Sequence, residues 1–447
     1  MNTFGVGRVW AAVGAWRLFV RCPVGLPWFR FRRDPGEHGQ LLCRVQERER
    51  ERVAGRSRTK AALAVLLWLA LGVRELWRHH RQYRHLARGD PSAPGPWVRL
   101  GQAIRAWLGD NISPHEYYRY RLYRRENWIR RSAYFLAWQS HPLLVELDAA
   151  RAGEVARAKD KLCFWQRCRE LGLPTVPVVA AARAGRLVEP LGRELPAEDL
   201  VMKPVDGYGG LGVEFFFRVS SLESWTDGTR GFTAGELLAR LCERAGAGGA
   251  ILQPRVANHP ATEVISNGFL VTLRLVSGRF PGGAPFLVAA ACRMPAGAGR
   301  VANLSGGPVV AAIELETGRL AAAERAFPGE GLFELHPDSG GRIAGRPLPF
   351  WEESCELVLE AHRAFGAFPS IGWDVVLTPD GPLLLEFNTL WAPSILQVHG
   401  HAPLGSTLAS ACLLAHWRAL RGEGGQGGAG ADASVGRRAA ARRAVPA

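Results

Sequence analysis

Residues 200–214 read LVMKPVDGYGGLGVE, in which a short apolar run leads to Lys203 and a proline, and four glycines then fall within six residues. Backbone amides of such a loop can approach an anion closely, because no Cβ intervenes and positive φ angles cost little. A second apolar run follows, so the stretch predicts a β-hairpin that binds polyphosphate. It is not a P-loop, which would carry Gly-Lys-Ser/Thr and continue into a helix. The alternative is a flexible turn without a ligand.

A second hairpin is predicted over residues 370–389, which read SIGWDVVLTPDGPLLLEFNT. Two apolar runs flank Pro-Asp-Gly, a combination that suits a three-residue hairpin loop. Such a loop pairs Thr378 with Pro382 and therefore places Asp374 directly opposite Glu386. Like charges in that arrangement repel, and a partly buried pair of carboxylates needs a cation or a shared proton.

The second hairpin also carries an amide. Asn388 lies two residues beyond Glu386, so both side chains share one face of the strand. Asp, Glu and Asn oxygens suit Mg²⁺ that bridges substrate phosphates. No Cys or His joins them, which argues against zinc. The alternative is a half-exposed hairpin whose acids face water.

The lysine-headed glycine loop and the D…E-x-N hairpin, about 170 residues apart, together resemble the ATP-grasp superfamily. Other segments are similar to the sugar-transfer-associated ATP-grasp proteins, which are related to alpha-L-glutamate-ligase-like enzymes. These segments read AKDKL at 158–162, LGLP at 171–174, QPRVANHP at 253–260, TLR at 272–274 and IGWD at 371–374. The resemblance covers roughly residues 135–410. It implies an α+β fold in which two lobes clasp ATP.

The resemblance implies which residues bind the nucleotide. Lys161 would contact the α-phosphate, and Lys203 the α- and β-phosphates. The flap over the triphosphate would contain Gly207, Gly209, Gly210 and Gly212. The hinge between the lobes would lie at residues 252–256, where many members carry acidic residues that bind the ribose. This chain has Gln253 there, which leaves a hydrogen bond rather than a charged contact.

The resemblance also implies the metal site and the chemistry. Asp374, Glu386 and Asn388 would hold two Mg²⁺ ions, and Arg274 and Arg293 would stabilise the transferring phosphoryl group or the substrate carboxylate. The implied activity is an Mg-ATP-dependent ligase that activates a small-molecule or sugar-linked carboxylate as an acyl phosphate for attack by an amine. Cell-envelope polysaccharide or sugar-conjugate biosynthesis is the setting that the family's name suggests.

The net charge of +15 has a separate origin. Residues 1–160 hold 29 basic and 14 acidic residues and nine of the fifteen tryptophans, whereas the rest of the chain is balanced. Basic, Trp-rich helices suit an anionic surface, so we expect peripheral contact with an anionic membrane through residues 1–130. The alternative is an arginine-rich composition bias with tryptophans in a helical core. No nucleic acid is expected, because no RRM, KH or zinc-finger signature is present.

The chain divides by composition into four parts. Residues 1–55 form a basic and irregular segment, residues 56–150 a helical region, residues 151–420 the ATP-grasp domain with its lobes split near 253–257, and residues 421–447 a disordered Gly/Ala/Arg tail. The eight cysteines form no CxxC pair, which favours a reducing cytoplasm. The apolar run at 61–73 has 13 residues, fewer than the roughly 20 that span a bilayer. The Arg/Trp-rich first third motivates a second hypothesis, a membrane- or polymer-associated adaptor that keeps the fold without ligase turnover.

Overall fold

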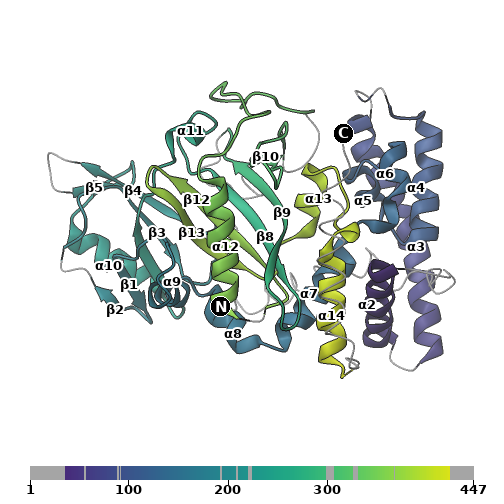
Figure 1. Ribbon diagram of the computed structural model, residues 1–447, viewed down its shortest axis with the longest axis horizontal. Helices are drawn as coiled ribbons and strands as arrows, with labels where there is room; N and C mark the ends of the chain where they lie inside the picture. The colour runs from purple at the N-terminus through teal and green to yellow at the C-terminus, as the bar shows by residue number, and fades with distance from the viewer. Residues whose placement is uncertain are drawn as a thin grey trace, which may run out of the picture.

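The computed structural model describes residues 36–54, 57–87, 90, 92–191, 194–207, 210–219, 224–297, 307–325, 331–366 and 368–422. The predictions made for residues 1–35, for Gly209 and for residues 423–447 lie outside the described residues. The described chain forms a helical region and two α+β lobes. Along the long axis of the molecule, the second lobe lies between the helical region and the first lobe (Figure 1).

The helical region is built around buried tyrosines. Its helices are α2 (Gly36–Ala54), α3 (Arg58–Tyr83), η2 (Arg84–Ala87), α4 (Pro96–Asp110), α5 (Pro114–Arg119), α6 (Arg125–Ile129), η3 (Arg131–Ala133) and α7 (Ala137–Ala149). A capping box of Ser113 and Glu116 begins α5 and satisfies two backbone amides that the helix itself leaves unpaired. The core side chains include Tyr117, Tyr118, Tyr120, Tyr123 and Tyr134.

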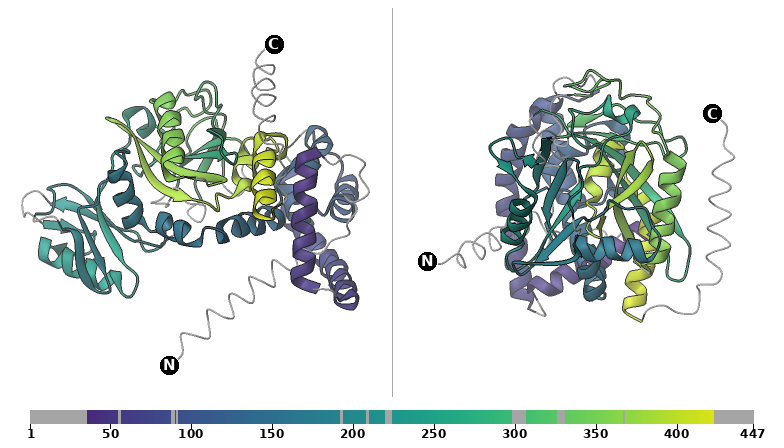
Figure 2. Two further views of the ribbon diagram at one scale, coloured as in Figure 1. Left: turned by 60° about the horizontal axis from the view of Figure 1, so that its bottom comes forward. Right: turned by 90° about the vertical axis from the view of Figure 1, so that its left-hand side faces the viewer.

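Helix α2 occupies part of the segment that the sequence analysis expected to be irregular. Leu41 and Val45, four residues apart and therefore on one face, are both buried. They pack against α14 (Leu408–Leu420), with which α2 is in contact in Figures 1 and 2. Helix α2 was not predicted because its short apolar stripe is next to the densely charged run around residue 48. Its packing partner, α14, lies near the other end of the sequence.

The first lobe contains a seven-stranded sheet in the order β2-β1-β7-β3-β4-β5-β6. Its elements are α8 (Ala152–Lys159), α9 (Lys161–Glu170), β1 (Ala180–Arg183), β2 (Arg186–Leu191), β3 (Leu200–Pro204), β4 (Glu214–Val219), β5 (Ser224–Thr226), β6 (Gly231–Phe232), α10 (Ala234–Ala245) and β7 (Ala250–Pro254). Helix α10 buries Leu237, Leu241 and Ala245, one residue per turn, against this sheet.

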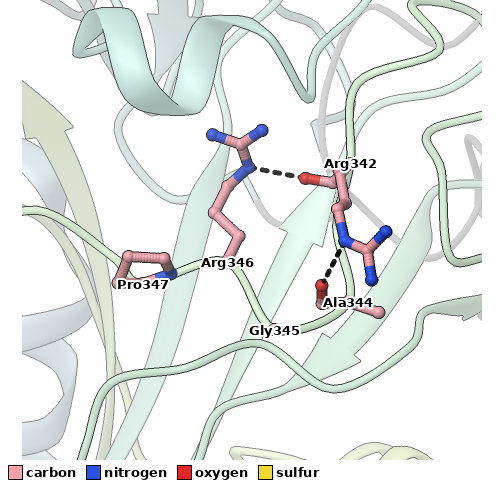
Figure 3. A pocket seen from close by; sticks show the side chains of 5 residues that line it. All are labelled: Arg342, Ala344, Gly345, Arg346 and Pro347. Atoms are coloured by element: carbon pink, nitrogen blue, oxygen red, sulfur yellow. Dashed lines mark hydrogen bonds between the residues drawn. The ribbon is translucent and has the colours of Figure 1, made fainter.

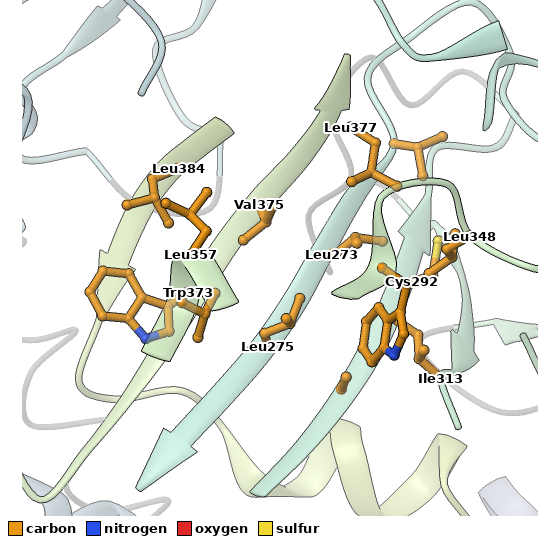
Figure 4. Packing of buried hydrophobic residues seen from close by; sticks show 14 of the residues in the cluster. Leu273, Leu275, Cys292, Ile313, Leu348, Leu357, Trp373, Val375, Leu377 and Leu384 are labelled. Atoms are coloured by element: carbon orange, nitrogen blue, oxygen red, sulfur yellow. The ribbon is translucent and has the colours of Figure 1, made fainter. Parts of the chain in front are cut away.

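The second lobe contains a six-stranded antiparallel sheet in the order β11-β10-β9-β8-β12-β13. Its elements are α11 (Pro260–Glu263), β8 (Thr272–Arg279), β9 (Pro285–Met294), β10 (Val309–Ala312), β11 (Glu324–Arg325), α12 (Trp351–Phe365), β12 (Ser370–Thr378), β13 (Gly381–Asn388), α13 (Pro393–His399), η5 (Leu404–Ser406) and α14. Helix α12 covers one face, where Leu273, Leu275, Trp373 and Val375 pack beneath Leu357 (Figure 4).

The opposite face of this sheet carries charged residues as well as an apolar patch. Helices α2, α7, α13 and α14 cover the patch, which includes Val276, Ala291 and Val310. Alternation along the strands places Arg274 and Arg293 on this face, because they lie two residues from Val276 and Ala291. Asp374 shares the face because it pairs directly with Arg274. These three charged residues, on β8, β9 and β12, belong to the site described next.

Candidate functional site

Asp374 lies directly opposite Glu386 on the β12–β13 hairpin, as predicted, although the predicted turn is wrong. Thr378 pairs with Gly381 rather than with Pro382, so the loop has two residues instead of three. A bulge between Asp374 and Val375 then adds one residue to β13 and restores the predicted pairing. The two carboxylates face each other because these two differences cancel.

Two arginines of neighbouring strands hold the Asp374 carboxylate. Arg274 Nε donates to Oδ1 at 2.7 Å, and Arg293 Nη2 lies 2.8 Å from Oδ2. All three side chains are buried, with Asp374 only 5% exposed. Burial alone would raise the pKa of Asp374, but Arg274 and Arg293 outweigh it and hold that pKa below its ordinary value. Asp374 is therefore ionised at neutral pH.

Lys161 connects the first lobe to the second carboxylate. It begins α9, where the Asp160 side chain caps the helix by accepting from two backbone amides at 3.0 Å. Its Nζ donates to the carbonyl of Gly207 in the glycine loop and lies 3.4 Å from Glu386 Oε1. Its backbone N–H donates to Val205 at 2.9 Å. One lysine thus contacts α9, the glycine loop and β13.

Lys203 is half-buried at the end of β3, opposite Ile251 of β7. Burial is the main reason that its pKa falls to about 8, and the positive charge of Lys161 lowers it further. Glu386 and Asp374 act in the opposite direction. Both lysines and both carboxylates therefore interact at the junction of the two lobes. Among the described residues no carboxylate forms an ion pair with Lys203, and an ammonium in that situation is suited to an anionic ligand.

The glycine loop joins β3 and β4, which pair as an antiparallel hairpin with Met202 opposite Glu214. A Cβ on Gly207 would lie 2.5 Å from Pro204 Cγ, so no larger residue fits there without a shift. Gly210 and Gly212 have φ angles of 71° and 75°, which residues with a Cβ rarely adopt. Gly207, Gly210 and Gly212 are thus required by the local geometry of the loop, independently of any ligand.

Gln253, which was predicted to lie at the hinge, is buried and forms a hydrogen bond within the protein. Its side chain is 6% exposed, and Nε2 donates to the carbonyl of Val176 at 3.0 Å. This hydrogen bond holds the segment around Val176, which leads into β1, against β7. A contact between Gln253 and a ribose stays a prediction.

The donor set fits a divalent cation. Two carboxylates and one amide supply the hard oxygens that Mg²⁺ prefers. Asn388 Nδ2 is buried and has no hydrogen-bond partner among the described residues, and a rotation of the amide would place its oxygen there instead. Asp374 Oδ1 accepts from Arg274 Nε and keeps a second lone pair, whereas Oδ2 lies against both Arg274 and Arg293. Among the described residues, no group of three or more His, Cys, Asp or Glu side chains could hold a metal ion, so a metal here would depend on two carboxylates and the Asn388 amide.

A charged cluster that the sequence analysis missed lies on the same face of the second sheet. Arg293 is opposite Val310, and Val310 is opposite Glu324 on β11, so all three share the face. Arg121 of the helical region forms an ion pair with Glu324, which is 2% exposed. The helical region is thus attached to the sheet by a buried charge pair. No sequence signal links two residues 203 positions apart.

A pocket of about 420 Å³ lies apart from the candidate site, and none of the site residues lines it (Figure 3). It is lined by Arg342, Ala344, Gly345, Arg346 and Pro347. Nε of Arg346 donates to the carbonyl of Arg342, and Nε of Arg342 donates to the carbonyl of Ala344. Both arginines thus help to hold the fold of their own loop.

Residues 149–412 match the family described as sugar-transfer associated ATP-grasp. Among solved structures, the chain is similar to a D-alanine–D-alanine ligase from Bacillus anthracis (13% identity, 61% of this chain and 71% of that chain, TM-score 0.33). It is also similar to an L-amino acid ligase from Bacillus licheniformis (12%, 58% and 48%, 0.33) and to an ADP complex of N5-carboxyaminoimidazole ribonucleotide synthetase (11%, 52% and 45%, 0.30). The chain thus spans about half the length of the last two proteins. No curated protein matches it significantly.

Proposed function

Because the chain belongs to the sugar-transfer-associated ATP-grasp family, we propose that it is an Mg-ATP-dependent ligase that joins a carboxylate to an amine. One observation carries the proposal. Lys161 of the first lobe lies 3.4 Å from Glu386 of the second lobe, Glu386 faces Asp374, and the charge of Lys203 interacts with both carboxylates. One bound ATP could therefore contact both lysines through its phosphates, while its Mg²⁺ contacts the two carboxylates.

The nucleotide would lie between the two lobes. Lys161 and Lys203 would neutralise the phosphates, and amides of the loop that begins at Gly207 would donate to phosphate oxygens. Asp374, Glu386 and Asn388 would hold Mg²⁺. When bound, the metal neutralises charge on the phosphates and orients them. Since Glu386 already contacts Lys161, ATP binding would redistribute these charges rather than bury new unpaired ones.

Arg274 and Arg293 would act on the group that is transferred. Besides Asp374, Arg293 contacts Thr272 Oγ1 at 3.1 Å and Arg274 contacts the Trp391 carbonyl at 3.3 Å, so both guanidinium groups are fixed in position. A substrate carboxylate oxygen would attack the γ-phosphorus, and ADP would leave. An amine would then attack the acyl carbon of the acyl phosphate, lose a proton and release inorganic phosphate. Fixed positive charge near the transferring phosphoryl group lowers the energy of such transition states.

A phosphate-release screen of acids and amines in pairs tests this function. We expect phosphate release only when Mg-ATP, one acid and one amine are present together, with an amide product seen by mass spectrometry. Phosphorylation of an acceptor hydroxyl without any carboxylate would instead assign a phosphotransferase. Tight nucleotide binding without turnover for every pair would favour the adaptor hypothesis.

The affinity for ATP should depend on pH through Lys203. The pKa of about 8 in the free protein means that the ammonium loses its proton as pH rises through that value. Bound phosphate favours the charged form, so the affinity should be greatest below pH 8 and should fall above it by up to about tenfold per pH unit. Calorimetric titration across this range measures the effect. In Lys203→Arg the charge persists, so any binding that remains should not change with pH.

A further inference from the structure

Helix α3 is apolar on two opposite faces. One face is buried, because Trp68, Gly72 and Leu76 pack toward α4 and α5. Trp68 packs against Trp107 with ring centroids 4.9 Å apart and ring planes tilted by 52°, and a Cβ on Gly72 would lie 1.9 Å from the Trp107 ring. The buried face therefore has a complete set of partners within the helical region.

The opposite face of α3 carries a row of exposed large apolar side chains. At about 100° per residue, the row falls within one third of the helix circumference and points away from Trp68. Between Leu63 and Trp77 it extends for about 21 Å at 1.5 Å per residue. We call this row the α3 stripe. It consists of Leu63 (57% exposed), Leu66 (62%), Leu67 (40%), Val73 (50%) and Trp77 (53%).

The charges around the α3 stripe are basic. Lys60, Arg74, Arg78 and Arg81 are all exposed and lie within or beside the stripe on the helical wheel. The only acidic residue of α3, Glu75, turns away from the stripe and contacts Arg78 and His79. A row of apolar side chains with basic residues along it complements a surface that has negative charges above an apolar layer.

We propose that the α3 stripe docks the protein onto an anionic lipid surface. The helix would lie in the plane of the interface with the apolar side chains among the acyl chains and the basic residues at the headgroups. Trp77 has the amphipathic ring that is favoured at that depth, as has Trp97 (79% exposed) on the adjacent helix α4. No helix among the described residues is long and apolar enough to cross a membrane, so contact through a helix face is the mode that the described chain offers.

The docking surface lies at the far end of the molecule from the nucleotide-binding residues. In Figure 1, α3 and α4 form the right-hand edge, whereas the first lobe with β3 and β4 forms the left-hand part. A membrane at the α3 edge would leave the junction of the two lobes open to solutes. The docking proposal needs no turnover, so it and the ligase proposal can fail independently.

Vesicle flotation of the full chain tests the docking. Equimolar phosphatidylglycerol and phosphatidylcholine vesicles should carry the wild-type protein upward, whereas pure phosphatidylcholine should carry much less of it. The double variant Leu66→Glu, Val73→Glu should bind the anionic vesicles at least about tenfold more weakly, since two apolar contacts become like-charge repulsions. Arg74→Glu with Arg81→Glu should remove the preference for phosphatidylglycerol.

Leu332→Glu with Leu335→Glu is the matched control, because these leucines are 54% and 51% exposed but lie outside the α3 stripe. This control should float like the wild type, and all variants should unfold at wild-type temperature because only exposed positions change. Wild-type protein that stays with the pellet, or an α3 double variant that still floats, would overturn the proposal. Conversion of a lipid-free dimer to a monomer by the α3 variant would also overturn it and assign the stripe to a second copy of the chain.

Discussion

Lys203→Ala is expected to reduce ATP-dependent phosphate release by at least about 100-fold, a loss typical of removing one charge that stabilises the transition state. The folded protein should not be weakened. Burial lowers the pKa of Lys203 to about 8, which shows that the fold disfavours the charged ammonium. Removing it should therefore leave the unfolding temperature unchanged or raise it. Phosphate release and thermal unfolding measured on the same preparation separate the two effects.

Lys159→Ala is the matched control for this experiment. Lys159 lies two residues before Lys161 but points to Asp148, at 3.3 Å, and is 39% exposed. The partner carboxylate of Asp148 is 17% exposed and also accepts from Thr389 Oγ1, so it keeps a partner when Lys159 is removed. A partly exposed ion pair contributes little to stability, so the control should keep its activity. If Lys203→Ala retained full activity, the assignment of the glycine loop to the nucleotide would be wrong.

Glu386→Gln is expected to remove most of the enhancement that Mg²⁺ gives to nucleotide binding. Changes to groups that only support a metal ligand already lower metal affinity by about 10–100-fold, so loss of a direct carboxylate ligand should cost at least as much. The Glu386 side chain is 25% exposed and lies 3.4 Å from Lys161, whose Nζ keeps its hydrogen bond to the Gly207 carbonyl when Glu386 is changed. Calorimetric titration of a non-hydrolysable ATP analogue with and without Mg²⁺ measures the change.

Asp374→Asn would not separate metal binding from folding. It would leave the buried Arg274 and Arg293 without their shared carboxylate, and breaking a buried ion pair costs about 3–5 kcal/mol of stability. The control for Glu386→Gln is Asp380→Asn, which removes a carboxylate from the exposed turn of the same hairpin. Binding of the analogue that depends on Mg²⁺ equally in Glu386→Gln and in the wild type would contradict the metal role of Glu386.

Local sequence was sufficient where a short range of residues decides the geometry. The β3–β4 hairpin follows from the glycines and their apolar flanks, and the facing of Asp374 and Glu386 follows from the β12–β13 pattern. Even there, the loop length was predicted incorrectly. The two-residue loop shifted the pairing by one residue, and a bulge between Asp374 and Val375 restored it. Bulges depend on how a strand meets its neighbours rather than on the strand alone.

Contacts between distant elements could not be read from the sequence. Asp374 meets Arg274 across 100 residues, and Lys161 meets Glu386 across 225. The pair of Arg121 and Glu324 joins two parts of the chain that the sequence analysis treated as unrelated. Each depends on strand order and helix docking, which fix the partners only after the chain has folded.

The composition by itself indicated that the first third of the chain is basic and rich in tryptophan, and the motifs indicated the family and the residue types of the proposed nucleotide site. Only the tertiary structure decided which apolar residues became core and which became surface. Trp68 and Leu66 belong to the same helix and the same apolar run, yet Trp68 is 2% exposed and Leu66 is 62% exposed. The physical reason is that a helix can bury only the faces against which other elements pack, and α4 and α5 pack on one face of α3.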